Sequence, residues 1–372
     1  RRLRQRGRSQ VIMGAVGGRR LLVAAAIGLS LVAAACSGGG SSGDPTQGAG
    51  YSDAPGEKQL QFIGAGKVRM GATLTMPAGV GGPAPAVLIV PGPGLTSRDG
   101  RTVGAPIDNI YKDLSKAFVA AGMATFRYDH RGTGASTLDP GVQPTWDDMV
   151  TDAQEALKYL SERGEIDGNR LAVVGHDMAG AIALKLAAAD NRVKSVALVA
   201  APGRPLVDVW AAEFQTLTGQ ISADAFRALV AELQSTGNFP PRAGMRAEHQ
   251  TVLPIGQDAL YRAMFAIDPL ADAKAVKVPV IIALGEKSTS VTQEDATLIA
   301  QAVGGRSEVV VAPNATATLQ TLKVRPPSSP NGDPSDMSSM GGGPIIADAP
   351  RDMPSVAKIT AFLGSSVGAR AA

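Results

Sequence analysis

The segment Val173-Val174-Gly175-His176-Asp177-Met178-Ala179-Gly180 decides the fold. Its apolar start is typical of a buried strand, and the glycines and small residues that follow indicate a sharp turn and then a helix. A strand that runs through such a turn into a helix presents the side chain at the apex of the turn. The segment therefore predicts that Asp177 stands at the end of a buried strand.

Strands and helices alternate on both sides of this segment. Apolar runs predict strands, the first two antiparallel, at residues 59–63, 67–76, 86–90, 124–128, 170–174, 193–200, 280–284 and 308–311. Amphipathic patterns predict helices at residues 107–121, 146–163, 179–189, 293–303 and 355–363. Thr145 is the expected N-cap of the second helix. The alternation predicts an α/β fold with a mostly parallel central sheet and helices on both faces.

The composition divides the chain into a leader, a linker and one folded domain. Residues 1–36 are predicted to be a signal peptide, and residues 37–56, rich in Gly and Ser, a flexible linker. Residues 57–365 form the predicted domain. Residues 204–270 are helical and polar between two core strands, which predicts a cap insertion. Residues 323–345 are of low complexity and are predicted to form a loop without regular structure.

The leader predicts export and a lipid anchor. Arg19 and Arg20 precede the apolar run 21–31, which is too short to span a membrane comfortably, and small residues then lead to Cys36. This pattern resembles a bacterial lipobox, which implies cleavage before Cys36 and attachment of lipid to its thiol, on the outer side of the cell membrane. The alternative is an ordinary secretory signal in which Cys36, the only cysteine, has no role. The true start could be Met13.

The charge distribution excludes a nucleic-acid-binding role. The net charge of the chain is +3, but the first 36 residues hold seven arginines and no acidic residue. Without these seven positive charges the net charge of the remainder is −4. The basic charge therefore belongs to the leader, and no basic stripe for nucleic acid is present.

Further motifs follow in a consistent order along residues 57–365. Val90–Gly94 with Arg98–Gly100, then Arg127–Ser136, Gly285–Lys287 and Pro313–Ala317, each follow a predicted strand. Together with Gly175–Ala179 they resemble the oxyanion loop, the Y-D-x-R-G-x-G-x-S loop, the G-E-K-D turn, the N-H position and the G-x-S-x-G elbow of bacterial hydrolases. The resemblance is to α/β-hydrolases near the serine aminopeptidases and the acyl-peptidase-like esterases. It implies an α/β-hydrolase fold with a helical cap insertion.

The resemblance also assigns the positions of a Ser-Asp-His triad. The nucleophile position holds Asp177, the acid position holds Ser288, and the histidine position is Thr316 or, as the better match, Ala317. None of these is the residue that the triad requires. The chain has three histidines, His130, His176 and His249, and none of them follows the strand 308–311. The ring of His176 is expected to point away from Asp177, and His249 in the cap is the one candidate for a substitute base.

The oxyanion hole is also expected to be altered. Its donors would be the backbone N–H of Met178 and one from the loop after Gly92. The residue that follows Gly92 is Pro93, which has no N–H. The loss of one such donor costs about 3 kcal/mol of transition-state stabilisation.

Two interpretations of Asp177 remain open. It could be a nucleophile, since G-H-D resembles the elbow of epoxide hydrolases and haloalkane dehalogenases, which still need a histidine. It could instead cap the helix that begins near Met178, worth about 1 kcal/mol. Two weaker hypotheses are that Asp208 replaces the triad acid, and that Asp99, Asp129 and Asp177 form a cation site. Gly92–Gly94 lacks the Lys of a phosphate loop, so no cofactor is expected.

The sequence therefore predicts an envelope lipoprotein with a hydrolase fold and without triad chemistry. We expect it to bind a small apolar ligand or another envelope protein, with no metal. The alternative is an active hydrolase of esters, amides or epoxides that uses Asp177 as its nucleophile.

Overall fold

The computed structural model describes residues 55–92, 94–102, 108–139, 142–218, 222–241, 258–322 and 350–370. The predicted leader with Cys36, nearly all of the predicted linker, and the predicted low-complexity loop lie outside these residues. Pro93 and His249 lie outside them as well. Of the helices in the described part, none is both long and apolar enough to cross a membrane.

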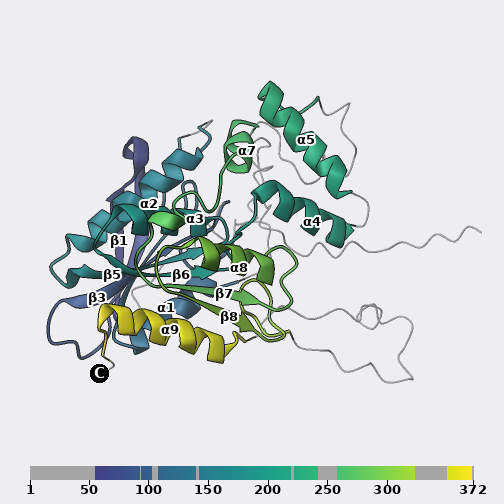
Figure 1. The fold of residues 1–372 in the computed structure, drawn as a ribbon. Helices are drawn as coiled ribbons and strands as arrows, with labels where there is room; N and C mark the ends of the chain where they lie inside the picture. The colour runs from purple at the N-terminus through teal and green to yellow at the C-terminus, as the bar shows by residue number, and fades with distance from the viewer. Residues whose placement is uncertain are drawn as a thin grey trace, which may run out of the picture.

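One eight-stranded sheet organises the described residues, in the order β1-β2-β4-β3-β5-β6-β7-β8 (Figure 1). The strands are β1 (Glu57–Ile63), β2 (Arg69–Thr75), β3 (Ala84–Val90), β4 (Ala124–Tyr128), β5 (Ile166–His176), β6 (Val193–Val199), β7 (Val280–Gly285) and β8 (Ser307–Ala312). β2 pairs antiparallel with β1 and with β4, and all other neighbours pair in parallel. The predicted mostly parallel sheet, with an antiparallel pair at its start, is confirmed.

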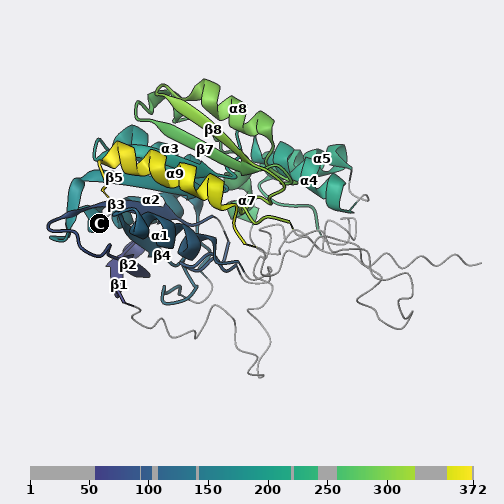
Figure 2. The same cartoon turned by 90° about the horizontal axis from the view of Figure 1, so that it is seen from below.

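Helices cover both faces of the sheet, as Figures 1 and 2 show. The helices are α1 (Ile110–Ala120), α2 (Trp146–Ser161), α3 (Ala179–Ala189), α8 (Gln293–Ala302) and α9 (Met353–Val367). α2, α3 and α8 pack on one face, and α1 and α9 on the other. Successive residues of a strand point to opposite faces, so Leu88 joins the first core and Val87 and Ile89 join the second. β3 is buried on both sides, which explains its uninterrupted apolar sequence.

Within the described residues, three α-helices are inserted between β6 and β7, in the region where the sequence predicts a cap. They are α4 (Leu206–Thr218), α5 (Ala223–Thr236) and α7 (Asp258–Phe265). Figures 1 and 2 show α4 and α5 beyond one end of the sheet. The insertion has aromatic packing of its own: the ring centroid of Trp210 lies 5.2 Å from that of Phe265 and 6.0 Å from that of Tyr261.

Local hydrogen bonds set the helix ends. The Thr145 side chain accepts a hydrogen bond from the Asp148 N–H, and the Asp148 carboxylate accepts one from the Thr145 N–H. The prediction that Thr145 caps α2 is therefore confirmed. The helix predicted from residue 107 begins at Ile110, whose N–H donates to the Asp108 carboxylate at 2.8 Å. β5 begins four residues earlier than predicted, because Ala84 of β3 pairs with Ile166 before the register shifts.

Candidate functional site

The turn between β5 and α3 holds Asp177 in the left-handed region of backbone space, with φ of 54°. This conformation costs a non-glycine residue on the order of 1–2 kcal/mol. Two close approaches maintain it: a Cβ on Gly175 would lie 2.5 Å from the Ala179 carbonyl oxygen, and a Cβ on Gly180 would lie 2.4 Å from the Ala201 Cβ. The glycines of the motif let strand, turn and helix pack this tightly, with Asp177 at the apex.

The interpretation of Asp177 as the N-cap of α3 is wrong. α3 begins at Ala179, its N-cap position is Met178, and no side chain makes a capping hydrogen bond there. Burial raises the pKa of the Asp177 carboxyl to about 6, and the N–H of Met178 only partly offsets this rise. A capping carboxylate would have a lowered pKa, because hydrogen bonds and the helix dipole stabilise its charged form.

The two described histidines are engaged away from Asp177. The Nδ1 atom of His176 lies 3.1 Å from the hydroxyl of Tyr111, which also accepts a hydrogen bond from the Gly92 N–H at 2.8 Å. Burial lowers the pKa of His176 to about 4, so this ring is neutral near pH 7. The Nε2 atom of His130 lies 3.3 Å from the Pro91 carbonyl oxygen. Among the described residues, no imidazole bonds to the Asp177 carboxyl.

Of the predicted oxyanion donors, the N–H of Met178 faces the Asp177 carboxyl, and Pro93 lies outside the described residues. The N–H of Gly92, just before Pro93, donates to Tyr111. Gly92 packs directly against the turn, since a Cβ at this position would lie 3.4 Å from the Asp177 Cβ. Tyr111 therefore joins the loop after β3 to the turn after β5.

The residues predicted to replace the triad acid and base follow neighbouring strands. Ser288 follows β7 and Ala317 follows β8, and the parallel pairing of β5 to β8 brings both loops to the edge that carries Asp177. Ser288 Oγ is buried without a hydrogen-bond partner. The two loops are joined by the Asn314 N–H, which donates to the Glu286 carboxylate at 2.9 Å. No hydrogen bond joins Asp177, Ser288 and Ala317 in the described structure.

A second carboxyl group, Glu213 of α4, belongs to this site. Its side chain is 7% exposed and accepts a hydrogen bond of 3.4 Å from the Thr289 hydroxyl, next to Ser288. Burial and the nearby charge of Asp177 raise the pKa of Glu213 to about 7. Glu213 was not predicted from the sequence, because a single Glu on an amphipathic helix is usually a solvated charge. Its place one turn after Trp210, on the buried side of α4, was the available signal.

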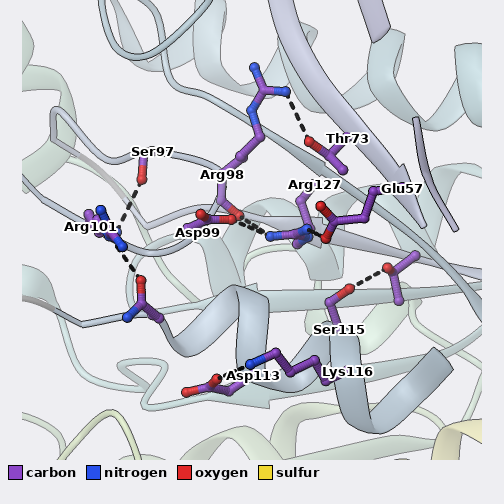
Figure 3. Close-up of polar contacts among 12 residues, drawn as sticks. Glu57, Thr73, Ser97, Arg98, Asp99, Arg101, Asp113, Ser115, Lys116 and Arg127 are labelled. Carbon is purple, nitrogen blue, oxygen red and sulfur yellow. Dashed lines mark hydrogen bonds and ion pairs between the residues drawn. The ribbon is translucent and has the colours of Figure 1, made fainter. Parts of the chain in front are cut away.

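The proposed cation site at Asp99, Asp129 and Asp177 is absent. The Arg98 Nε donates to Asp129 at 2.9 Å. The Arg127 guanidinium pairs with Asp99 and, at 3.0 Å, with Glu57, as Figure 3 shows. These crossed ion pairs fasten the loop after β3 to the end of β4, and they compensate two of the three carboxylates. Across the described residues, no group of three or more potential metal ligands occurs.

Asp208 does not take the place of the triad acid either. It lies on the surface of the cap, where the Arg227 Nε donates to its carboxylate at 2.8 Å. The elbow therefore combines Asp177 and Glu213, and both described imidazoles bond to other groups. These groups can accept or donate hydrogen bonds and exchange protons near pH 7. They cannot activate a serine hydroxyl, because the nucleophile position holds none.

Comparison with known proteins agrees with this architecture. The chain is 27% identical over 239 residues to the esterase EstD of Thermotoga maritima, covering 64% of this chain and 54% of that protein, so it spans about half the length of this relative. A hypothetical protein from Pseudomonas aeruginosa matches with a TM-score of 0.51 and 17% identity, over 70% of this chain and 86% of that one. An esterase from Pyrococcus furiosus matches with a TM-score of 0.51 and 15% identity, over 70% and 83%.

The two solved structures share the fold, and the EstD match adds sequence similarity to an esterase. The match that decides the family is to the model described as serine aminopeptidase, S33, which covers residues 108–316 and hence more than half of the chain. The chain is therefore a member of the serine aminopeptidase S33 family, within the α/β-hydrolases.

Proposed function

We propose that this protein binds a small ligand at the elbow, beneath the cap, and does not carry out serine-triad hydrolysis. The observation that carries the proposal is Asp177, a carboxyl group at the apex where the family places its nucleophile. Serine hydrolysis needs a hydroxyl nucleophile and a base that takes its proton. Here the apex carries no hydroxyl, and both described histidines bond elsewhere.

The distribution of apolar residues favours a small ligand over an envelope protein as the partner. A protein partner would be expected to dock on a contiguous exposed apolar patch. The large apolar side chains exposed in the described part are divided among several segments: Ile63 of β1, Val142 before α2, Val309 and Val311 of β8, and Met353 of α9. The cap instead buries its aromatic rings on the side of α4 that also carries Glu213. The proposed ligand is mainly apolar, with one polar group that meets the two carboxyl groups.

Hydrogen exchange with 1-decanol as the probe tests this proposal. We expect decanol to protect peptides that contain Asp177 and α4 from exchange. The internal control is the apolar groove of 330 Å³ between α1 and α9, which Ala117, Met353 and Val356 help to line. Protection confined to α1 and α9, or no protection at any decanol concentration, would contradict a ligand site at the elbow.

A second candidate function is hydrolysis with Asp177 as the nucleophile, and Glu213 is the observation that favours it. The aspartate-nucleophile mechanism needs a base that activates water against the ester intermediate. A carboxyl group with a pKa of about 7, close enough to sense the charge of Asp177, meets the pKa requirement of that base. Turnover of styrene oxide or p-nitrophenyl butyrate that is abolished both by Asp177→Asn and by Glu213→Gln would establish this candidate and displace the first.

We also propose that the mature protein is anchored to the outer side of the cell membrane by lipid on Cys36. The support is the position of the only thiol directly after the apolar run of the leader. Cys36→Ala should move the protein from the membrane fraction to a soluble or uncleaved form. Unchanged detergent partitioning of this variant would refute the anchor.

A further inference from the structure

Glu213 makes a polar contact between the cap and the core at the elbow. It lies on α4, and the Thr289 hydroxyl of the loop after β7 donates to it. The charge of Asp177, from the turn after β5, is near enough to add to the rise that burial causes in the pKa of Glu213. Cap, elbow and β7 loop therefore meet at two carboxyl groups, one of them almost fully buried.

The described elements around this pair provide no compensating cation. Arg204, before α4, pairs with Asp295; Arg227 of α5 pairs with Asp208 and Asp224; and Lys287 of the β7 loop pairs with Glu286. Asp258 and Arg262 of α7 form no ion pair with either carboxylate, and Tyr111 of α1, which senses the charge of Asp177, contributes a neutral hydroxyl. Within the described residues, no ion pair reaches Asp177 or Glu213.

We propose that Asp177 and Glu213 form a proton-operated latch that holds α4 against the elbow. While at least one of the two carboxyl groups keeps its proton, the pair carries at most one negative charge and α4 stays packed. When both protons have gone to solvent, two negative charges face each other in a poorly solvated site without a cation. Their repulsion and their demand for water then favour release of α4.

Near-neutral pH is the range in which this latch would operate. Burial raises the pKa of Asp177 to about 6, and burial together with the Asp177 charge raises that of Glu213 to about 7. The packed cap holds these protons more tightly than the released cap does. The ratio of released to packed cap should therefore rise about tenfold for each pH unit over which one proton is lost. The latch itself does not depend on the proposed function. Its consequence, the control of ligand access to the elbow site, rests on that function.

The chain contains a reporter for this motion. It has two tryptophans, Trp146 and Trp210, and Trp210 lies on α4 one turn before Glu213 and is 8% exposed. In a Trp146→Phe background, emission therefore comes from α4 alone. We expect the emission of Trp210 to shift to longer wavelength, and its quenching by acrylamide to increase, as the pH rises through 6 to 8. Far-UV circular dichroism should stay constant over this range.

Three variants test the assignment without any ligand. Glu213→Gln and Asp177→Asn, one on each side of the contact, should each abolish the pH-dependent change in emission. Glu232→Gln, which alters an exposed acid on α5, should leave the change intact. An unchanged transition in the first two variants, or constant Trp210 emission in the folded parent between about pH 5 and pH 8.5, would overturn the latch. Failure of decanol binding would leave these results unaffected, so the latch and the ligand site can fail separately.

Discussion

Buried carboxyl groups occur in two different settings in this protein. In the framework, Asp129, Asp152 and Asp295 each receive a guanidinium hydrogen bond, from Arg98 at 2.9 Å, Arg131 at 2.6 Å and Arg204 at 2.7 Å. At the elbow, Glu213 is buried and Asp177 half-buried, and within the described structure neither has a cationic partner. The same type of side chain is thus compensated where it joins loops and, among the described residues, uncompensated at the turn that presents Asp177.

The presence or absence of a cationic partner distinguishes the carboxyl groups of the framework from those of the candidate site. A paired carboxylate keeps its charge, and so fixes the loops that it joins. Burial raises the pKa of Asp295, but hydrogen bonds from Arg204 and from backbone N–H groups outweigh it and lower the pKa overall. At the elbow nothing outweighs burial, so both pKa values are raised. A carboxyl group whose pKa is raised by burial, without a cationic partner, is more typical of a functional site than of a structural framework.

The largest effect is expected from breaking a framework pair. Asp129→Asn removes the negative charge that balances the buried guanidinium of Arg98, which is 1% exposed. We expect the free energy of unfolding to fall by about 3–5 kcal/mol in a urea titration. The matched control is Asp224→Asn, whose carboxylate is 95% exposed and should contribute less than about 0.5 kcal/mol. If Asp129→Asn and Asp224→Asn lowered the free energy of unfolding equally, the paired carboxylates would not stabilise the framework as inferred.

At the elbow, removal of a carboxylate charge is expected to raise the free energy of unfolding rather than lower it. Glu213→Gln removes a charge that the folded protein solvates poorly, so this variant should be more stable than the parent at pH 8, by about 1–3 kcal/mol. The exposed control Glu232→Gln should change the free energy of unfolding by less than about 0.5 kcal/mol. A Glu213→Gln variant less stable than the parent at pH 8 would show that this charge is compensated by a group outside the described residues.

The pH dependence of stability should also differ between the carboxyl groups of the elbow and those of the framework. Asp177 and Glu213 have folded pKa values above the usual values of 3.8 and 4.5. Their contribution is therefore complete below about pH 4 and is lost as the pH rises through 6 and 7. Asp295, with a lowered pKa, contributes in the opposite direction, and its share is lost as the pH falls below about 4. Urea titrations should show stability falling from pH 5 to pH 8, and a flatter profile in the double variant Asp177→Asn, Glu213→Gln.

The framework could be predicted from the sequence because its signals are local. The apolar runs, the cap at Thr145 and the turn motif at Gly175–Gly180 each depend on residues that are neighbours in the chain. The crossed pairs of Arg98 with Asp129 and Arg127 with Asp99 could not be predicted, although both loops were recognised as motifs. Their partners come from loops about thirty residues apart, and only the register of β3 with β4 brings them together.

The elbow shows the other limit of sequence reasoning. The identity of the apex residue and the absence of a histidine after β8 were readable from the chain alone. The protonation state of Asp177 could not be predicted. Its pKa depends on burial beneath a cap, and no local sequence pattern specifies the position of that cap. Glu213 was not predicted for the same reason. Its spacing from the apolar residues of α4 is that of any polar residue on an amphipathic helix, and only the packing of α4 brings it to the elbow.

The smallest effect is expected from Asp177→Ser alone, and the series that starts from it is the most direct test of the triad assignment. Asp177→Ser alone should remain nearly inactive towards p-nitrophenyl butyrate, because no base is placed to take the serine proton. Adding Ser288→Asp and Ala317→His supplies acid and base on the loops after β7 and β8, which share the edge of the sheet with the apex. We expect only weak turnover, because the Gly92 N–H already donates to Tyr111. Adding Tyr111→Phe frees this donor, and one oxyanion donor is worth about 3 kcal/mol, or roughly a hundredfold in rate. If Tyr111→Phe has no effect on an active triple variant, the loop after β3 is not the oxyanion loop of this protein.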